Sequence, residues 1–409
     1  MGLSRWTRAL VALAVVVPAF AAATANASTL SDDEAVPLGS RADAGEWDEN
    51  VANMAEAFRY TAAADGPVDA VNVKLDRRFV SRRQSAPNAR LIAGIYANGN
   101  GRPGALLGKG TLNSFDHRAW NTVPITPVEL EKGERYWIAV MSRGETITLK
   151  TSTFGRGTDP SATSPKNMND LPAAWRHDRT FEGDSPASLY AVERYSVLVF
   201  TKNATGQTAE GVAALRALPD AQEVTFDVTD DATDFNDANL AKYRAVVFLN
   251  NAGELLDAAQ QAAFEKYFKG GGGFLGIHSA IEAEPDWQFM TDILGTRADG
   301  RTDALDATIK VADRVHVASK GLPEYWTRND RWYNFTGNVR GFSHVLATVD
   351  ENTYTGGTDG FDHPIAWCKD YQGGRSFYTG GGGTAGTYGT SGFRQHLAGA
   401  LDWAAGKAD

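Results

Sequence analysis

The sequence predicts an α/β domain built on a parallel sheet, preceded by an antiparallel β-sandwich domain. From Tyr195 onward, short apolar runs alternate with amphipathic segments, as strands and helices do around a parallel sheet. From residue 57 to residue 151, short segments of alternating apolar and polar residues follow one another between Gly, Pro and Asn breaks, without a helical period. The length of 409 residues, at about 150 residues per domain, leaves room for both domains.

The composition is that of an ordinary globular protein, with 43% hydrophobic and 22% charged residues. The formal net charge is -10, and a field of that sign repels a phosphate backbone. Nucleic acid is therefore not expected as a partner. Cys368 is the single cysteine, so the chain has no intramolecular disulfide and depends on packing for its stability.

The N-terminus has the pattern of a secretory signal peptide over residues 1–27. Arg5 and Arg8 precede an apolar run over residues 9–23, and the small residues that follow end at Ala27. The alternative is a membrane anchor, but the run is shorter than the roughly 20 residues that span a bilayer. We expect cleavage near Ala27, which leaves an acidic extracellular protein that is not attached to a membrane.

Residues 28–45 are rich in Ser, Asp and Gly and are predicted to form a flexible leader. Residues 46–190 are predicted to form the β-sandwich accessory domain. Within them, residues 151–186 are rich in turn formers and are expected to be the tail of this domain and its connection to the second domain. The expected strands cover residues 57–62, 68–76, 89–98, 136–142 and 145–152.

Residues 195–406 are predicted to form the α/β domain. One helix should begin after the N-cap Asp257 and stop at Gly270, and another should close the chain over 393–405. A further helix is expected over 208–218. The expected strands cover residues 195–202, 223–228, 245–250, 274–277, 308–313, 344–350, 363–370 and 375–380.

His278 directly follows the expected strand 274–277. Residues at the carboxyl end of a parallel strand face the crevice where such sheets bind ligands. A sharp turn from strand to helix would lift this side chain into the crevice, as in a nucleophile elbow. Imidazole can then act as an acid, a base or a metal ligand. The same position also suits a histidine that only holds neighbouring loops by hydrogen bonds.

A set of motifs in the second half, taken in order and spacing, is shared with a known family. They are VLVFTK, AVVFLNNAGELL, GGGGFLGIHSA, DRWYNF, HVLATVDE, HPIAW, GRSFYTGGG and FRQHLAGALDWAAG. With them, the chain from Tyr195 to about Gly406 resembles the ThuA-like (trehalose utilisation) family. This resemblance implies a class I glutamine amidotransferase-like (flavodoxin-like) fold. It also implies a role in disaccharide or polysaccharide utilisation, with action on a glycoside or keto-glycoside in a crevice around His278.

The elbow of amidotransferases carries a cysteine, whereas the resemblance places His278 there. Thiol-based glutamine hydrolysis is therefore disfavoured, and Cys368, inside an expected strand, should be a small buried residue. The chain also departs from the family. No His follows its first strand, Arg331 stands where the family often has Glu, and Gly381–Gly383 replace a Gly-His pair. The alternative function is thus a non-catalytic carbohydrate-binding protein with a degenerate ThuA-like site.

The remaining polar candidates would suit acid/base chemistry or a metal, while the aromatic ones would suit stacking on a sugar. Each candidate also has a purely structural alternative. Asp330 could cap a helix or turn, His363 could be a turn-forming surface residue, and the aromatic residues could belong to the core. The catalytic candidates are His278, Asp330 and His363, with His344 as a further polar candidate, and the substrate-binding candidates are Trp287, Trp332 and Tyr333.

The first domain resembles the accessory β-sandwich (jelly-roll) modules of secreted bacterial proteins over residues 58–76, 91–112 and 120–142. Such modules bind carbohydrate or space domains apart. Its candidates for a sugar-stacking face are Trp120, Tyr136 and Trp137. Because Tyr136 and Trp137 are neighbours in a strand, they point to opposite faces, and at most one can belong to that face.

Overall fold

The structure is a computed structural model that describes residues 36–42, 45–76, 88–151, 158–218 and 223–408. The expected signal peptide, 1–27, lies outside the described residues, as does most of the expected leader. The described end of the leader contains a short strand, β1 (Leu38–Gly39), in which Leu38 is buried. No helix within the described ranges is long and apolar enough to cross a membrane.

The N-terminal half is made of antiparallel sheets, as predicted. One sheet has the order β1-β12-β4-β7, a second has the order β11-β10-β3-β8-β5-β6, and β2 pairs with β9. These strands are β2 (Glu46–Asn50), β3 (Ala55–Thr61), β4 (Gly66–Lys74), β5 (Arg90–Gly99), β6 (Arg102–Leu112), β7 (Trp120–Leu130), β8 (Arg135–Arg143), β9 (Ile147–Thr151), β10 (Asp159–Thr163), β11 (Arg179–Ser185) and β12 (Leu189–Val192).

Strand β8 is covered on both faces. Tyr136 and Ile138 pack into the main sandwich core, while Trp137 and Ala139 pack into a second apolar cluster. Tyr136 is 9% exposed and Trp137 is fully buried. Neither residue therefore lines an open sugar-stacking face, because a second apolar cluster covers the face of the six-stranded sheet that would have been open. Trp120 is half-buried and stands edge-on to Tyr190.

The segment 151–186, predicted as a tail and connection, instead contributes β10 and β11 to the six-stranded sheet. Strand β6 was also not predicted, because its glycines are typical of turns. The reason for those glycines is close packing. A Cβ on Gly110 would lie 1.6 Å from the carbonyl oxygen of Pro124, and one on Gly108 would lie 2.3 Å from that of Thr126.

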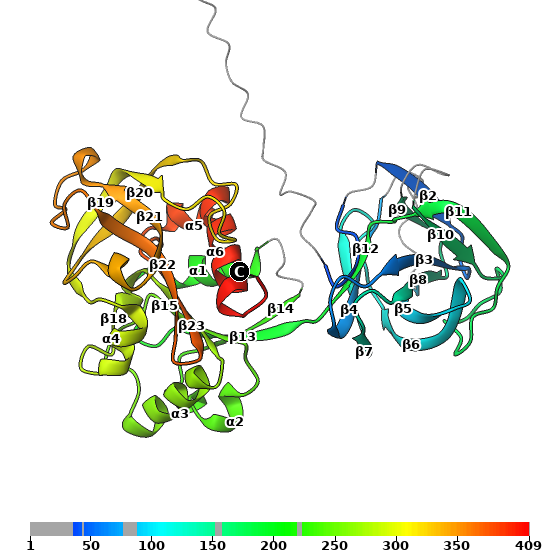
Figure 1. Cartoon of the computed structure of the whole chain (residues 1–409), viewed down its shortest axis with the longest axis horizontal. Coiled ribbons are helices and arrows are strands. Elements are labelled where there is room, and N and C mark those ends of the chain that lie inside the picture. Colours follow the sequence, from blue (N-terminus) through cyan, green and yellow to red (C-terminus); the bar gives the residue numbers. More distant parts are fainter. Residues whose placement is uncertain (1–35, 43–44, 77–87, 152–157, 219–222, 409) are drawn as a thin grey trace, which may run out of the picture. The chain divides into compact units, whose positions relative to one another are not determined.

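The C-terminal half forms one mixed sheet, in the order β14-β13-β15-β17-β23-β22-β21-β19-β20 (Figure 1). The pairings from β14 to β23 are parallel, and those from β23 to β20 are antiparallel. The strands are β13 (Tyr195–Phe200), β14 (Val224–Thr229), β15 (Ala245–Leu249), β17 (Gly273–Ile277), β19 (Ala298–Val311), β20 (Tyr325–Phe335), β21 (His344–Asp350), β22 (His363–Tyr371) and β23 (Gly374–Thr379). A parallel α/β sheet with added strands is confirmed.

Helices cover both faces of this sheet. In β13, Val197 and Val199 pack with residues of α1 and α6, while Leu198 and Phe200 pack with residues of α3 and α4. Asp257 caps α3 in a capping box, and Gly270 follows its last residue, as predicted. The helices are α1 (Thr208–Arg216), α2 (Asp237–Leu240), α3 (Ala258–Lys269), α4 (Gln288–Leu294), α5 (Ala385–Gly389) and α6 (Ser391–Ala404).

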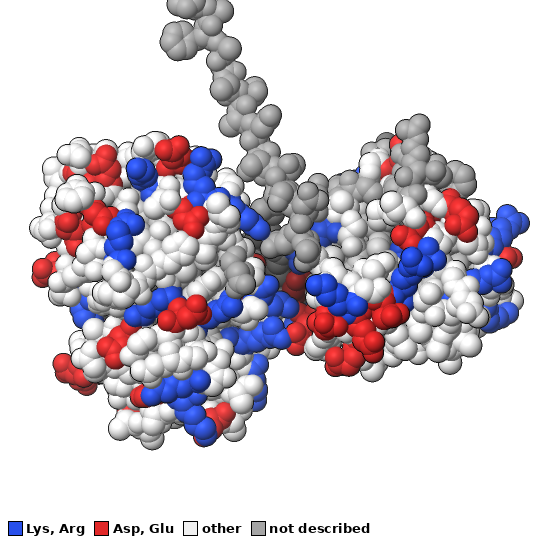
Figure 2. All heavy atoms as spheres, viewed as in Figure 1, with Lys and Arg blue, Asp and Glu red and all other residues white. Residues whose placement is uncertain are grey.

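The charged residues of the α/β domain do not separate by sign on the face that Figure 2 shows. Lysine and arginine are interspersed there with aspartate and glutamate. Charge alone therefore marks no binding surface on this face of the domain.

Candidate functional site

His278 directly follows β17 and begins a one-turn 3-10 helix, His278–Ile281. Its φ of 49° lies in the left-handed region, which a residue with a side chain adopts only at a cost. The predicted sharp turn after the buried strand is thus present. The imidazole, however, is 1% exposed.

Both nitrogens of the His278 ring are engaged by the protein. Nε2 lies 3.3 Å from the carbonyl oxygen of Arg331, and Nδ1 lies 3.0 Å from Ser279 Oγ. A carbonyl can only accept, so Nε2 carries the proton and Nδ1 accepts from the Ser279 hydroxyl. Burial lowers the pKa of His278 to about 4, against the opposing charge of Asp330. The imidazole is therefore neutral at pH 7.

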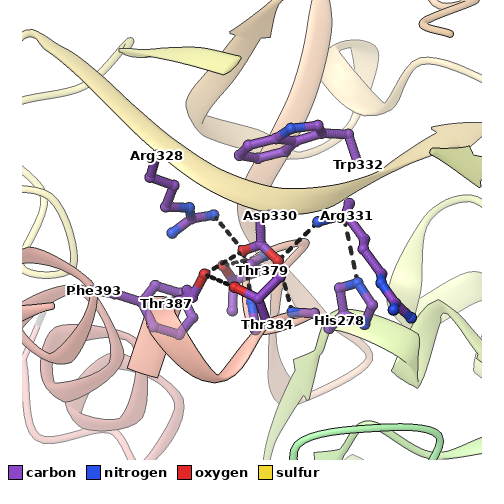
Figure 3. A network of polar contacts seen from close by, with 12 residues as sticks. His278, Arg328, Asp330, Arg331, Trp332, Thr379, Thr384, Thr387 and Phe393 are labelled. Atoms are coloured by element: carbon purple, nitrogen blue, oxygen red, sulfur yellow. Dashed lines mark hydrogen bonds and ion pairs between the residues drawn. The ribbon is translucent and has the colours of Figure 1, made fainter. Parts of the chain in front are cut away.

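Asp330, on β20, is fully buried and holds the loop after β23 (Figure 3). Its carboxylate accepts hydrogen bonds from the Gly382 and Gly383 amides, at 3.0 and 2.8 Å, and from Thr387 Oγ1, at 3.0 Å. The buried Arg328 guanidinium lies 3.4 Å away. Both carboxylate oxygens are thus occupied, and the group acts as a clamp on the loop.

Gly383 lies between the two candidates. A Cβ on Gly383 would meet His278 Nε2 at 2.4 Å and Asp330 Oδ1 at 2.9 Å. His278 and Asp330, two of the three catalytic candidates, therefore come together, but the Gly381–Gly383 loop fills the space between them. The roles of Arg328 and Thr387 were missed, because no motif marks them in the sequence.

His363, the third catalytic candidate, belongs to a separate cluster. Its Nδ1 lies 2.8 Å from Glu351 Oε1, and its Nε2 lies 2.7 Å from the carbonyl oxygen of Tyr333. The carbonyl can only accept, so Nε2 donates to it, while Nδ1 also has the Tyr354 hydroxyl as a partner, at 3.1 Å. The expected three-residue site is corrected accordingly: His363 faces acceptors of its own and does not face the His278 imidazole.

The His363 cluster has the donor types of a metal site. Ligand atoms of Glu351, Asp359 and His363 lie within 4.8 Å of one another. Burial raises the pKa of Asp359, and the charge of His363 opposes that shift. The protein itself supplies hydrogen-bond partners for both His363 nitrogens, namely Glu351 and Tyr354 at Nδ1 and the Tyr333 carbonyl at Nε2.

The expected sugar-stacking role is wrong for Trp332 and Tyr333, which are 0% and 1% exposed. They lie on opposite faces of β20, and the core covers both faces. Tyr333 instead places its ring 4.9 Å from that of His278. Trp287 is half-buried and packs against Phe264 and Phe289, so it belongs to the apolar cluster of α3 and α4.

His344 and Cys368 lie among other partners. His344 Nε2 is 2.8 Å from Asp313 Oδ2. Cys368 lies within β22, 2% exposed, with its Sγ 3.5 Å from His316 Nε2. Burial raises the pKa of the thiol to about 12, which confirms its expected place as a small buried residue and leaves no thiolate for nucleophilic chemistry.

Two arginines add a feature that sequence reasoning did not assign to the site. Arg331 and Tyr333 share one face of β20. Arg301, on the neighbouring strand β19, stands opposite Tyr333. Both guanidinium charges act on His278 and lower its pKa. Arg301 is exposed, and Arg331 Nε is buried without a hydrogen-bond partner among the described residues. Figure 3 shows the Arg331 side chain running alongside His278. The signal for Arg331 was its place where the family often has Glu.

Comparisons with known proteins find a matching family model and similar solved structures. Residues 196–404 match the model of the ThuA family, described as trehalose utilisation. A putative ThuA-like protein from Bacteroides uniformis is 20% identical, with a TM-score of 0.46 over 53% of this chain and 94% of that one. One from Parabacteroides merdae is 21% identical, with a TM-score of 0.45 over 53% and 92%. None of the curated proteins compared with the chain matches it.

Proposed function

Because the chain belongs to the ThuA (trehalose utilisation) family, whose model matches residues 196–404, we propose that it serves carbohydrate utilisation by binding a sugar at the rim of the His278 site. In this proposal the protein holds the sugar and does not transform it. The proposed ligand is a sugar that carries a carboxylate, such as a uronic acid.

One observation carries the binding role: the protein itself occupies the polar atoms that catalysis would use. General acid/base catalysis needs a side chain within hydrogen-bond reach of the substrate. Both His278 nitrogens face Arg331 and Ser279, and both Asp330 oxygens face the glycine loop or Thr387. With these groups saturated, the site offers recognition in place of acid/base chemistry.

The two arginines support an acidic ligand. Guanidinium groups bind carboxylates by paired, charge-assisted hydrogen bonds. Arg301 and Arg331 act on the same imidazole. Arg301 is exposed, and Arg331 is half-buried with an Nε hydrogen that no described residue accepts. Arg331 also reverses the charge that the family often places beside Asp330. A neutral disaccharide would gain less from this pair than a uronic acid.

A second candidate function is catalysis on a glycoside or keto-glycoside, and the backbone of His278 favours it. A histidine with a φ of 49° stores strain, and such strain gathers at functional sites. In this alternative, the Gly381–Gly383 loop moves away from the imidazole and frees Nε2 for the substrate.

The N-terminal pattern adds a location to the proposal. With residues 1–27 as a signal peptide, the sugar would be bound outside the cell. Expression of the full gene in a secreting bacterial host, followed by N-terminal sequencing of the protein in the medium, tests this. A mature chain that begins at Ser28 is expected, and retention of Met1 in the cell fraction would contradict it.

The sugar-binding proposal is tested by calorimetric titration of the full chain with a panel of disaccharides, half neutral and half ending in glucuronic or galacturonic acid. Each mixture is then analysed for products by chromatography. Binding of the acidic sugars without products supports the proposal. Product formation that His278→Asn abolishes supports catalysis instead, and binding of neutral sugars with equal affinity contradicts the acidic ligand.

A further inference from the structure

A group of oxygen-bearing side chains converges inside the β-sandwich, apart from the sugar site. Asp48 lies on β2, Glu56 on β3 and Asp184 on β11. One carboxylate oxygen from each lies within 4.8 Å of the others. Oxygen ligands bind calcium at 2.3–2.6 Å, so two of them on opposite sides of one ion are about 5 Å apart. A single ion can therefore contact all three.

Two of these carboxylates are buried, and the third, Asp48, is half-buried. Glu56 is 2% exposed and Asp184 is 8% exposed. Burial raises the pKa of Glu56 well above its usual range, and the charges of Asp48 and Asp184 raise it further. A buried carboxylate is costly unless a cation pairs with it or a proton neutralises it. Either a proton on Glu56 or a cation among the three carboxylates would relieve this repulsion.

Asn50 gives a second, independent observation. It follows Asp48 by two residues on β2, so both side chains point to the same face of the strand. Asn50 is 0% exposed, and its Nδ2 lies 3.4 Å from Glu56 Oε2, so its amide lies at the cluster. Its Oδ1 is buried without a hydrogen-bond partner among the described residues. A buried acceptor in that state points to a missing ligand such as an ion, and because Nδ2 is the atom that faces Glu56 here, the amide would turn to present Oδ1 to that ion.

We propose that the β-sandwich binds one calcium ion between Asp48, Asn50, Glu56 and Asp184. All the donors are carboxylate or amide oxygens, which suit a hard cation, and none is the nitrogen or sulfur that zinc prefers. The ion would join the β2–β9 pair to the six-stranded sheet through β3 and β11. Its role is to stabilise the fold of this half of the chain, independently of the proposed sugar function.

Calcium titration of the full chain, stripped with EDTA and returned to chelator-free buffer, tests the site. Calorimetry should show one calcium bound per chain. The midpoint temperature of thermal unfolding should rise with calcium and return to its starting value when EDTA is added. At a calcium concentration 100 times the Kd, the equilibrium constant for unfolding should fall about 100-fold. Magnesium should have a smaller effect, because it demands a tighter octahedral site. No binding heat and no shift in unfolding would overturn the proposal, as would magnesium matching calcium.

Two variants complete the test. Glu56→Gln removes the central carboxylate and should abolish the calcium response, while remaining at least as stable as the wild type in EDTA. Glu129→Gln changes an exposed glutamate of the same domain, on β7, and should respond like the wild type. If Glu56→Gln does not fold, Asp48→Asn takes its place. Calcium binding that either substitution at the cluster leaves unchanged would contradict the assignment.

Discussion

Gly383 and His278 lie so close that a single methyl group on the glycine would come within 2.4 Å of the imidazole Nε2. Gly383, in the loop after β23, and His278, the residue after β17, are thus packed directly against each other. Because Asp330 holds that loop by the Gly382 and Gly383 amides, the three segments form one unit. A residue larger than glycine does not fit at position 383 of this unit.

Substitution Gly383→Ala should destabilise the α/β domain. The added Cβ would clash with His278 and Asp330, and overpacking of this kind costs about 1–3 kcal/mol. Gly386→Ala is the matched control, since a Cβ there meets only Thr384 Oγ1, at 4.0 Å. Urea unfolding measures both variants. Equal stability of the two would show that the loop does not press on the imidazole.

Asp330→Asn should cost far more than the loss of an exposed ion pair. The substitution leaves the Arg328 guanidinium buried without its counter-charge, and breaking such a pair costs about 3–5 kcal/mol. Asp362→Asn removes the partner of Arg340 near the surface and should cost about 0–1 kcal/mol. Thermal unfolding compares the two variants, and a similar small loss in both would contradict the clamp.

Stability should fall as the pH drops from about 6.5 to about 4. Burial lowers the pKa of His278 and of His396 to about 4, from an ordinary value of 6.5. In that window the unfolded chain binds a proton at each histidine that the folded chain does not. Each therefore removes about 1.4 kcal/mol of stability per pH unit.

His278→Asn separates the two contributions to this pH dependence. Asparagine tolerates a positive φ and does not titrate, so the histidine part of the loss should be about halved. Urea unfolding at pH 7.5, 6 and 5 gives the slopes for the wild type and the variant. Identical slopes would mean that His278 is not held neutral by burial.

Cys368 should resist thiol reagents in the native protein. The side chain is 2% exposed, and a pKa of about 12 leaves almost no thiolate at pH 8. Reaction with a chromogenic disulfide should be slow without denaturant and complete in guanidinium chloride. Rapid labelling of the native chain would show that β22 opens readily.

Local sequence patterns were sufficient for the parts of the fold that depend on period and position. The apolar run at Tyr195, the cap at Asp257 and the place of His278 after β17 all follow from such patterns. Local patterns failed to predict strands whose residues are determined by packing against distant segments of the chain. Gly110 occurs in a strand because a neighbouring strand approaches it closely, and a local pattern cannot reveal that approach.

The site shows the same division. The residue types suggested that Asp330 and His278 could converge, and they do, because Asp330 accepts from the Gly382 and Gly383 amides after β23, the strand that pairs with β17. Their saturation was not predictable. It depends on amides of Gly382 and Gly383, which carry no side chain, and on the backbone oxygen of Arg331. His363 was grouped with them by residue type, although its two nitrogens hydrogen-bond to Glu351 and to the Tyr333 carbonyl.

The most direct test of an acidic-sugar site at His278 is the affinity of the Arg331→Glu variant for a disaccharide ending in glucuronic acid. Isothermal titration calorimetry should give a Kd at least tenfold weaker than that of the wild type, because a charge-assisted hydrogen bond contributes about 1.5–3 kcal/mol and 1.4 kcal/mol is a factor of ten. Lys310→Ala, an exposed cation on the same strand as Arg301, should bind like the wild type. Equal affinity of the wild type and Arg331→Glu for the acidic disaccharide would contradict the account.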